Sequence, residues 1–267
     1  MAWVATAELA AAVSNAGGLG IIAAGSAPAD IVKEEIRKTK ELTNSPFGVN
    51  IMLLSPSVDE IADLVIKEKV SVVTTGAGNP EKYIKKWKAA GIKIIPVVAS
   101  VALAKRMERY GADAIIAEGQ EAGGHIGEAT TMALTPQVCS AVSIPVITAG
   151  GIASGKQILA AEVLGACGVQ MGTIMLGTKE CPIHENYKEK ILAAKCSQVT
   201  VIGRINGLAT ILIKNPMSNE YLKLENIYRG YFSFRVVNNN LHIVNHIQLE
   251  DYLKGVVPKE LSPSYPM

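Results

Sequence analysis

The chain has 267 residues, of which 49% are hydrophobic and 24 are glycine, so it can bury a large core and turn sharply many times. A formal net charge of +2, without blocks of Lys and Arg, argues against nucleic acid as a partner. No apolar run has the roughly 18 residues of a membrane span, and no secretory signal follows the first methionine. We therefore expect a cytoplasmic protein without a membrane partner.

The four cysteines give no sign of a disulfide framework or of a zinc site. Cys139, Cys167, Cys181 and Cys196 form no CxxC pair, and the chain does not resemble a secreted protein. We predict reduced thiols and no bound metal.

In chain order, the first predicted element is an Ala-rich helix in "MAWVATAELAAAVSNAGG", which starts almost at residue 1 and ends at a glycine cap. Short runs rich in Val and Ile follow, without polar alternation, as in parallel strands that are buried on both faces. These predicted strands are residues 19–24, 47–53, 70–76, 92–98, 113–119, 144–151 and 167–173. Predicted helices between them are residues 28–42, 58–69, 80–90, 101–110 and 155–164.

This alternation of strands and helices predicts a parallel sheet, either open and doubly wound or closed into a barrel. Polar and glycine residues gather where the strands end, as in a (β/α)8 TIM barrel, whose active site is built from the loops at the carboxyl ends of its strands. No strand precedes the first helix. The predicted fold is therefore an α/β TIM barrel that lacks its first strand.

Two glycine-rich turns follow the last two predicted strands, in "TAGGIASG" and "QMGT". Such turns present backbone N–H groups at the start of helices, where a phosphate is bound favourably. Either turn alone indicates only a change of chain direction. Together, at the last two strand ends of a barrel, they favour a phosphate site.

Seven motifs in order resemble one family: "MAWVA", "AGGLGII", "PFGVNIML", "VVTTGAGNP", "AEGQEAGGHIG", "PVITAGGIASG" and "VQMGT". The resemblance is to the FMN-dependent family of nitronate monooxygenases (2-nitropropane dioxygenases) and enoyl-[acyl-carrier-protein] reductases II. It covers residues 1 to about 225, and "GVNIMLLSP" and "NYKEKILAAK" resemble the reductase branch more closely.

The resemblance implies roles for particular residues. His125 would be catalytic, orienting or protonating the substrate or, in a monooxygenase, removing a proton from a nitroalkane. The other residues would bind FMN: Met1, Ala2, Asn50, Glu118, Gly123, Gly124, Gly150, Gly151, Gly172 and Thr173. Among them, Asn50 and Glu118 would bond the ring edge or the ribityl chain, Gly123 and Gly124 would line the ring, and the last four would hold the phosphate.

The C-terminal part departs from this family. In "VIGRINGLAT", Leu208 stands where the reductases usually have a histidine. From about Ile227 the pattern is that of a β-hairpin around residues 238–240, and "LEDYLKGVVPKE" resembles a signature of SpoIID/LytB-type domains, which places their catalytic glutamate at Glu260. The expected domains are a flavin-binding barrel in residues 1–198, a remnant of the lid region in 199–226 and a partial SpoIID-like segment in 227–267.

Three functions of different classes follow from these resemblances. The favoured one is an FMN-dependent oxidoreductase that uses NADH or NADPH to reduce enoyl-acyl-carrier-protein in fatty acid synthesis, with nitronate monooxygenase as the alternative. The second is a peptidoglycan-acting fragment around Glu260. The third is an inactive chimera joined near residue 226. For the enzyme, we expect a small-molecule or acyl-carrier-protein-bound substrate, and a homodimer is compatible with the sequence.

Overall fold

The computed structural model describes residues 3–124 and 126–194, together with the backbone of four strands in the rest of the chain. The chain divides into two compact units, Met1–Ala193 and Ala194–Met267. Within the described ranges, none of the helices combines the length and the apolar composition that crossing a membrane requires.

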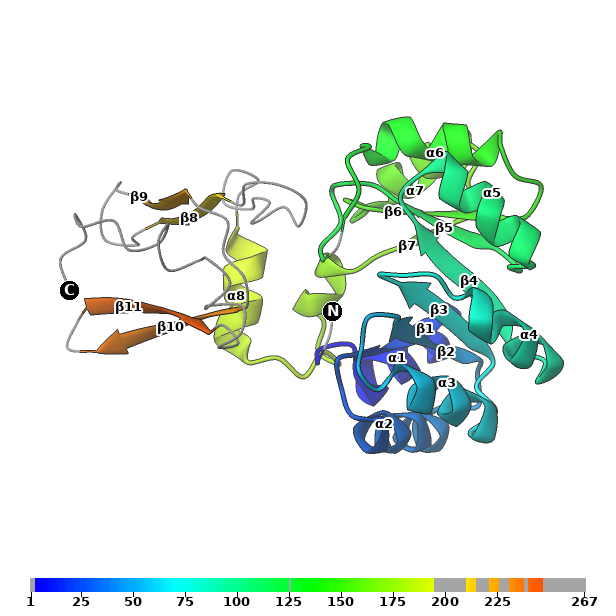
Figure 1. Cartoon of the computed structure of the whole chain (residues 1–267), viewed down its shortest axis with the longest axis horizontal. Coiled ribbons are helices and arrows are strands. Elements are labelled where there is room, and N and C mark those ends of the chain that lie inside the picture. Colours follow the sequence, from blue (N-terminus) through cyan, green and yellow to red (C-terminus); the bar gives the residue numbers. More distant parts are fainter. Residues whose placement is uncertain are drawn as a thin grey trace, which may run out of the picture. The chain divides into compact units, whose positions relative to one another are not determined.

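The first unit contains a curved sheet of seven parallel strands in the order β1-β2-β3-β4-β5-β6-β7 (Figure 1). These strands are β1 (Gly20–Gly25), β2 (Phe47–Met52), β3 (Val72–Gly76), β4 (Lys93–Val98), β5 (Ile115–Glu118), β6 (Val146–Ala149) and β7 (Gly168–Gln170). Each strand pairs with the next one in the sequence, which is the winding of a barrel, whereas a doubly wound sheet reverses its order at a switch point. The predicted fold, a TIM barrel with one strand fewer than eight, is confirmed.

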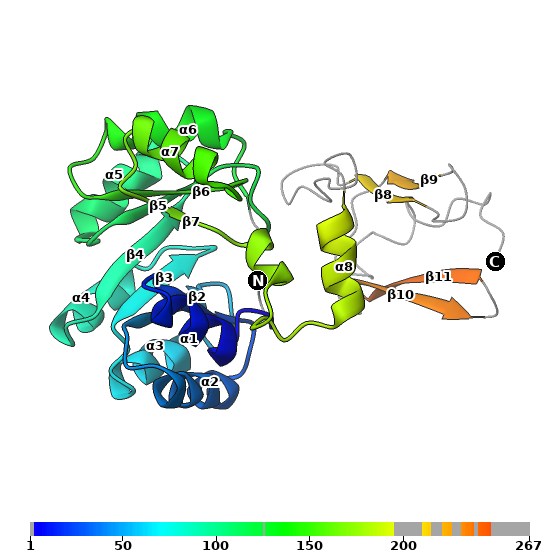
Figure 2. The ribbon, with the colours of Figure 1, turned by 180° about the vertical axis from the view of Figure 1, so that it is seen from behind.

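Helices cover the outer side of this sheet and follow one another around it in both views (Figures 1 and 2). They are α1 (Ala7–Asn15), α2 (Ala29–Leu42), α3 (Val58–Lys67), α4 (Glu81–Ala89), α5 (Val101–Tyr110), α6 (Thr131–Cys139) and α7 (Gly155–Val163). After β7 follow a 3-10 helix, η1 (Thr173–Gly177), and helix α8 (Glu185–Ala193), which contacts η1. The predicted strands and helices all have observed counterparts.

The largest apolar cluster lies between the first strands and helices α2 to α4. Val49, Ile51 and Val73 have no exposed surface, and they belong to the same cluster as Ile61 of α3 and Trp87 of α4. The Trp87 ring is fully buried, and its Nε1 donates to the Ala62 carbonyl oxygen at 3.0 Å. The Val- and Ile-rich runs therefore become strands because they are covered by helices, as expected of a parallel sheet.

The first helix begins at Ala7, not almost at residue 1 as the sequence indicated. Thr6, the residue before it, has an extended backbone, and its carbonyl oxygen accepts from the Ala10 N–H at 3.0 Å. The carbonyl oxygen of Ala5 accepts instead from the N–H of Ala23 in β1, at 3.0 Å. This bond to the edge strand holds the segment before α1 out of the helix.

Strands β6 and β7 and helix α6 also differ from the prediction. Strand β6 stops at Ala149 because Gly150 and Gly151 have φ values of 108° and 71°, which an extended strand does not have. Strand β7 stops at Gln170, and Thr173, expected at the end of that strand, begins η1. Helix α6, which the sequence analysis did not name, contains Pro136 within its nine residues, and this proline weakened its helical pattern.

In the second unit, the structure describes two antiparallel pairs of strands. Strands β10 (Tyr231–Val237) and β11 (Asn240–His246) pair from Tyr231↔His246 to Val237↔Asn240, which confirms the predicted hairpin. Strands β8 (Thr210–Lys214) and β9 (Tyr221–Glu225) form a second pair that the sequence analysis did not predict. Leu208 and Glu260 lie outside the described residues.

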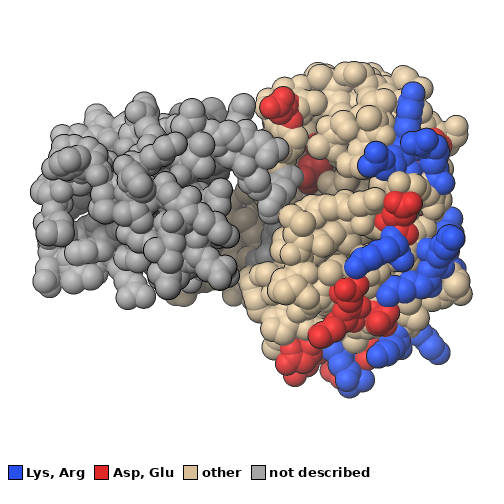
Figure 3. Space-filling view, viewed as in Figure 1, with Lys and Arg blue, Asp and Glu red and all other residues tan. Residues whose placement is uncertain are grey.

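Charges of both signs alternate over the helices on the face of the first unit shown in Figure 3. Two ion pairs join α4 to α3: Lys82 Nζ lies 3.0 Å from Asp59 Oδ1, and Lys86 Nζ lies 2.5 Å from Asp63 Oδ1. This part of the surface therefore presents no continuous basic face of the kind that nucleic acid requires.

Candidate functional site at the carboxyl ends of the strands

Because all seven strands are parallel, the predicted site residues at their ends meet at one edge of the sheet. Asn50 lies near the end of β2, Glu118 is the last residue of β5, and the glycine turns follow β6 and β7. The predicted residues His125, Met1 and Ala2 lie outside the described residues, so their roles stay predictions.

Asn50 is half-buried and is opposite Thr74 in the register of β2 and β3. Its Nδ2 donates to Thr74 Oγ1 at 2.8 Å. This bond fixes the orientation of the amide, and within the described part of the chain Oδ1 has no hydrogen-bond partner. The Asn50 amide is therefore an oriented acceptor at the strand ends, available to a ligand N–H.

Among the titratable groups described at this edge of the sheet, Glu118 has the largest shift in pKa. Its carboxyl group is half-buried, and burial raises its pKa from 4.5 to about 7. Near neutral pH it is therefore able both to accept and to donate a hydrogen bond. Such perturbed groups are often found at functional sites.

Gln170 shares a face of the sheet with Glu118, although the sequence analysis assigned it no role. The register pairs Glu118 with Ala149 and Ala149 with Gln170, and residues in register on parallel strands point to the same side. Gln170 is half-buried. Its place as the last residue of a strand, directly before a glycine turn, was the signal in the sequence that could have identified it.

The glycines before His125 leave open space beside the chain. A Cβ atom added at Gly123 or Gly124 would meet no atom of the described residues within 4 Å, and Gly124 has a φ of 96°. A side chain at Gly124 would be strained, because L-residues rarely adopt this backbone conformation. The geometry agrees with the expectation that a flat ligand can approach this backbone.

The turns after β6 and β7 start side by side, because Ala149 and Gln170 are in register. Within the described residues, the N–H groups of Gly151, Gly172 and Thr173 have no hydrogen-bond acceptor. Gly172 has φ and ψ of −120° and −80°, and Thr173 after it starts η1 and is exposed. Unpaired backbone donors at adjacent turns are the groups that hold a phosphate.

These observations fit a flavin mononucleotide. The turns after β6 and β7 offer N–H donors for its phosphate, Gly123 and Gly124 offer open backbone for its ring, and Asn50 and Glu118 offer polar groups for its ring edge. Among the described residues, no group of three His, Cys, Asp or Glu side chains is placed to hold a metal ion.

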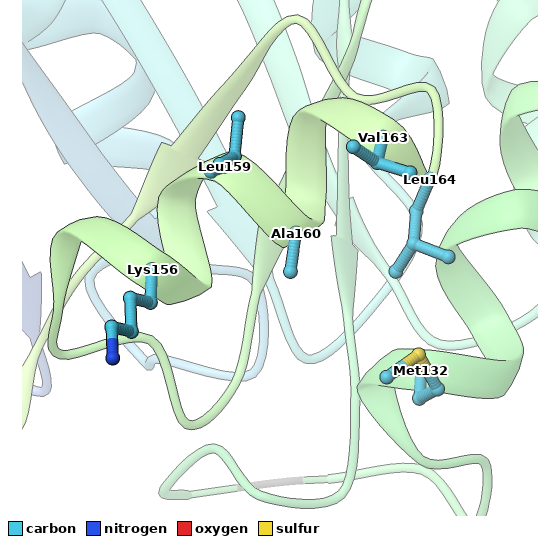
Figure 4. A pocket seen from close by; sticks show the side chains of 6 residues that line it. All are labelled: Met132, Lys156, Leu159, Ala160, Val163 and Leu164. Carbon is cyan, nitrogen blue, oxygen red and sulfur yellow. The ribbon is translucent and has the colours of Figure 1, made fainter.

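A groove of about 340 Å³ lies elsewhere, between helices α6 and α7. Figure 4 shows its lining: Met132 comes from α6, and Lys156, Leu159, Ala160, Val163 and Leu164 come from α7 and its C-terminal end. None of the predicted site residues lines this groove. It is therefore separate from the strand-end site.

Comparisons with known proteins give the family. A family model described as nitronate monooxygenase matches residues 1–66 and 59–231, and a model described as stage II sporulation protein matches residues 237–267. Both resemblances expected from the sequence are confirmed.

Three similar proteins illustrate the range of the family. A mutant of FabK from Thermotoga maritima is 54% identical with a TM-score of 0.75, over 76% of this chain and 69% of that chain. A probable nitronate monooxygenase of Staphylococcus haemolyticus is 34% identical over 90% of this chain and 80% of its own length. The (3aS,4S,5R,7aS)-5-hydroxy-7a-methyl-1-oxo-octahydro-1H-indene-4-carboxyl-CoA dehydrogenase of Rhodococcus jostii is 39% identical over 82% of this chain, which spans 62% of that relative's length.

The family model covers most of the chain, and the sheet, the strand-end turns and the solved relative agree with it. This chain belongs to the nitronate monooxygenase family.

Proposed function

We propose that this chain is an FMN-dependent oxidoreductase that uses NADH or NADPH to reduce the carbon–carbon double bond of an enoyl thioester carried by an acyl carrier protein. The observation that carries this choice is the identity of 54% to FabK, against 34% to the probable nitronate monooxygenase of Staphylococcus haemolyticus. The motif "GVNIMLLSP" supports the same branch of the family.

When bound, FMN would supply hydride transfer between the nicotinamide and the substrate. The residues of this chain would bind and orient the reactants. The N–H groups of Gly151, Gly172 and Thr173 would hold the phosphate, and Asn50 and Glu118 would fix the ring edge.

His125 is proposed as the proton donor or substrate-orienting group on the basis of the motif "EAGGHIG" alone. An imidazole has a pKa near neutrality, so it can donate a proton at the pH where the enzyme works. His125→Ala is expected to lower turnover by a factor of about 100 or more while the flavin stays bound. Near-normal turnover of this variant with both substrate classes would exclude the role.

A flavin absorption spectrum of the purified chain, followed by FMN titration, tests the cofactor. Substrate choice is tested by following NADH or NADPH oxidation with an enoyl thioester under nitrogen, and nitronate oxidation in air. Thioester reduction without nitronate oxidation supports the proposal. A chain that binds no FMN contradicts it.

Nitronate oxidation is the second candidate, because the relative that carries this name matches over 80% of its own length. In that reaction the same site would hold an alkyl nitronate beside the flavin, and no nicotinamide would be needed. Turnover of a nitronate in air without NADH or NADPH would favour this candidate.

The match of residues 237–267 to the stage II sporulation model favours a third candidate, a peptidoglycan-acting segment around Glu260. The inactive chimera is the alternative origin of this segment. Sequencing the gene across the codons for residues 215–235 tests the chimera. Release of soluble glycan from peptidoglycan, lost in Glu260→Gln, tests the lytic activity.

A further inference from the structure

Thr131, the first residue of α6, lies where the turn after β5 and the turn after β6 meet. It is 8% exposed, and its hydroxyl Oγ1 lies 2.9 Å from Glu121 Oε2 and 3.0 Å from the Gly150 carbonyl oxygen. Its backbone N–H lies 2.9 Å from Glu121 Oε2 and 3.2 Å from Oε1. One side chain therefore contacts the loops that follow two neighbouring strands.

The glycines of both turns pack tightly against this pair of residues. A Cβ atom would lie 2.2 Å from Thr131 Oγ1 if added at Gly119, and 2.5 Å from it if added at Gly150. A Cβ atom at Gly151 would lie 3.2 Å from the Cβ atom of Glu121. The absence of side chains at these glycines lets the two turns close on the Glu121–Thr131 pair.

Capping of α6 does not account for this arrangement, because the helix has its own cap. The hydroxyl of Thr130, the N-cap residue, accepts from the Ala133 N–H at 3.3 Å. Glu121 reaches the same helix from ten residues earlier in the chain. Its carboxylate is also favoured at a helix N-terminus by the helix dipole. The bond therefore ties the loop after β5 to the helix that follows it.

We propose that Glu121 is a positioning residue. By bonding Thr131, it fixes the loop of residues 119–124 against the turn after β6, and so presets the part of the site that receives the flavin. The inference rests on the proposed function for the identity of the ligand. It adds a role for a residue that contacts neither the ring nor the phosphate in that proposal.

Two measurements on the whole chain test this role. Hydrogen–deuterium exchange of the peptide that covers residues 119–124 shows, without any ligand, whether the Glu121–Thr131 hydrogen bond holds this loop in place. FMN titration then measures the effect of this bond on the affinity of the site. In Glu121→Ala, we expect faster exchange of this peptide and an FMN Kd about tenfold higher. A melting curve of each variant checks that it is folded.

Glu121→Gln is the conservative variant, because its amide oxygen still accepts from both donors of Thr131. We expect its FMN Kd within about threefold of the wild-type value. Glu128→Ala is the matched control. Glu128 is an exposed acid in the same loop, and it has no hydrogen-bond partner among the described residues. Its replacement should change neither the exchange of the peptide nor the FMN Kd. If Glu121→Ala does not fold, Glu121→Asp, shorter by one methylene, replaces it with the same expected direction.

Unchanged exchange in the alanine variant would overturn the inference, and so would faster exchange with an unchanged FMN Kd. Failure of the glutamine variant to restore binding would also overturn it, because it would assign the effect to charge alone. A wild-type chain that binds no FMN would instead overturn the proposed function, and Glu121 would then keep only a structural role.

Discussion

The two ends of the parallel sheet differ in how deeply they are buried. In β2 and β3, Val49, Ile51 and Val73 have no exposed surface. In β7, all three residues are only half-buried, and Ala161 is the one buried residue of α7. The first strands are therefore held by a continuous apolar core, whereas the last strand and its preceding helix have little burial to hold them.

This difference bears on function because the proposed phosphate turns lie at the weakly buried end. Apolar burial stabilises a fold by about 25 cal/mol per Å², so local opening of β7 and α7 costs less free energy than opening of β1 to β4. Regions with few buried apolar contacts open locally at a low cost in free energy. We expect ligand binding at Gly151 and Gly172 to stabilise this end more than the other.

The largest expected effect is a difference in unfolding free energy between a variant at the deeply buried end of the sheet and one at the weakly buried end. Trp87→Ala should lower the free energy of unfolding by about 3–5 kcal/mol, because it empties a fully buried site. Leu159→Ala on α7, where the side chain is 58% exposed, should change it by less than about 0.5 kcal/mol. Urea denaturation of both variants measures the difference, and equal losses would contradict the contrast.

The next largest effect is a difference in stability between alanine variants at two glycines of one loop. In Gly119→Ala the new methyl group would lie 2.2 Å from Thr131 Oγ1, so we expect a loss of about 1–3 kcal/mol in unfolding free energy. In Gly123→Ala it would meet no described atom within 4 Å, and stability should change by less than about 0.5 kcal/mol. If Gly123 lines the flavin ring, its variant should still bind FMN more weakly, which a titration shows.

A pH dependence is expected from Glu118. Burial raises its pKa to about 7 in the folded chain, so the folded state keeps a proton that the unfolded state, with a pKa of 4.5, has released. Stability should therefore fall as the pH rises from 4.5 towards about 7, and this contribution should stay constant above that range. Because the group is partly exposed, we expect a change of about 1–2 kcal/mol.

Glu118→Gln removes this titration, so its unfolding free energy should depend less on pH between 4.5 and about 7 than that of the wild-type chain. Chemical denaturation at several pH values within this range measures the difference. Identical pH profiles for the two proteins would show that Glu118 does not hold a raised pKa.

The smallest expected effect concerns the cap of α7. Ser154 Oγ accepts from the Gln157 N–H at 3.4 Å, and Ser100 caps α5 in the same way through Leu103 at 3.3 Å. Each serine-to-alanine change should cost about 0.5–1 kcal/mol. We expect Ser154→Ala to speed hydrogen exchange mainly within α7, since little burial holds that helix. Faster exchange throughout the first unit would contradict this.

Much of the fold could be predicted from the sequence, because the Val- and Ile-rich runs correspond to strands and the helical patterns between them correspond to helices. The ends of strands at residues with positive φ could not be predicted. Gly150 and Gly151 end β6 through positive φ values, and a glycine in the sequence does not reveal its own φ. Helix α6 was not predicted because Pro136 interrupts its helical pattern. Its start was marked in the sequence by Thr130, the N-cap residue, and Thr131, the first residue of the helix.

For the site, the sequence by itself determined which motifs follow the strands and in which order they come, because strand order in a barrel follows chain order. Only the tertiary structure decided how these ends contact one another. The register brings Gln170 onto the face of Glu118, and the close packing of two turns brings Glu121 to Thr131. Such contacts depend on distances between strands, loops and helices, which no periodicity within one segment of the sequence encodes.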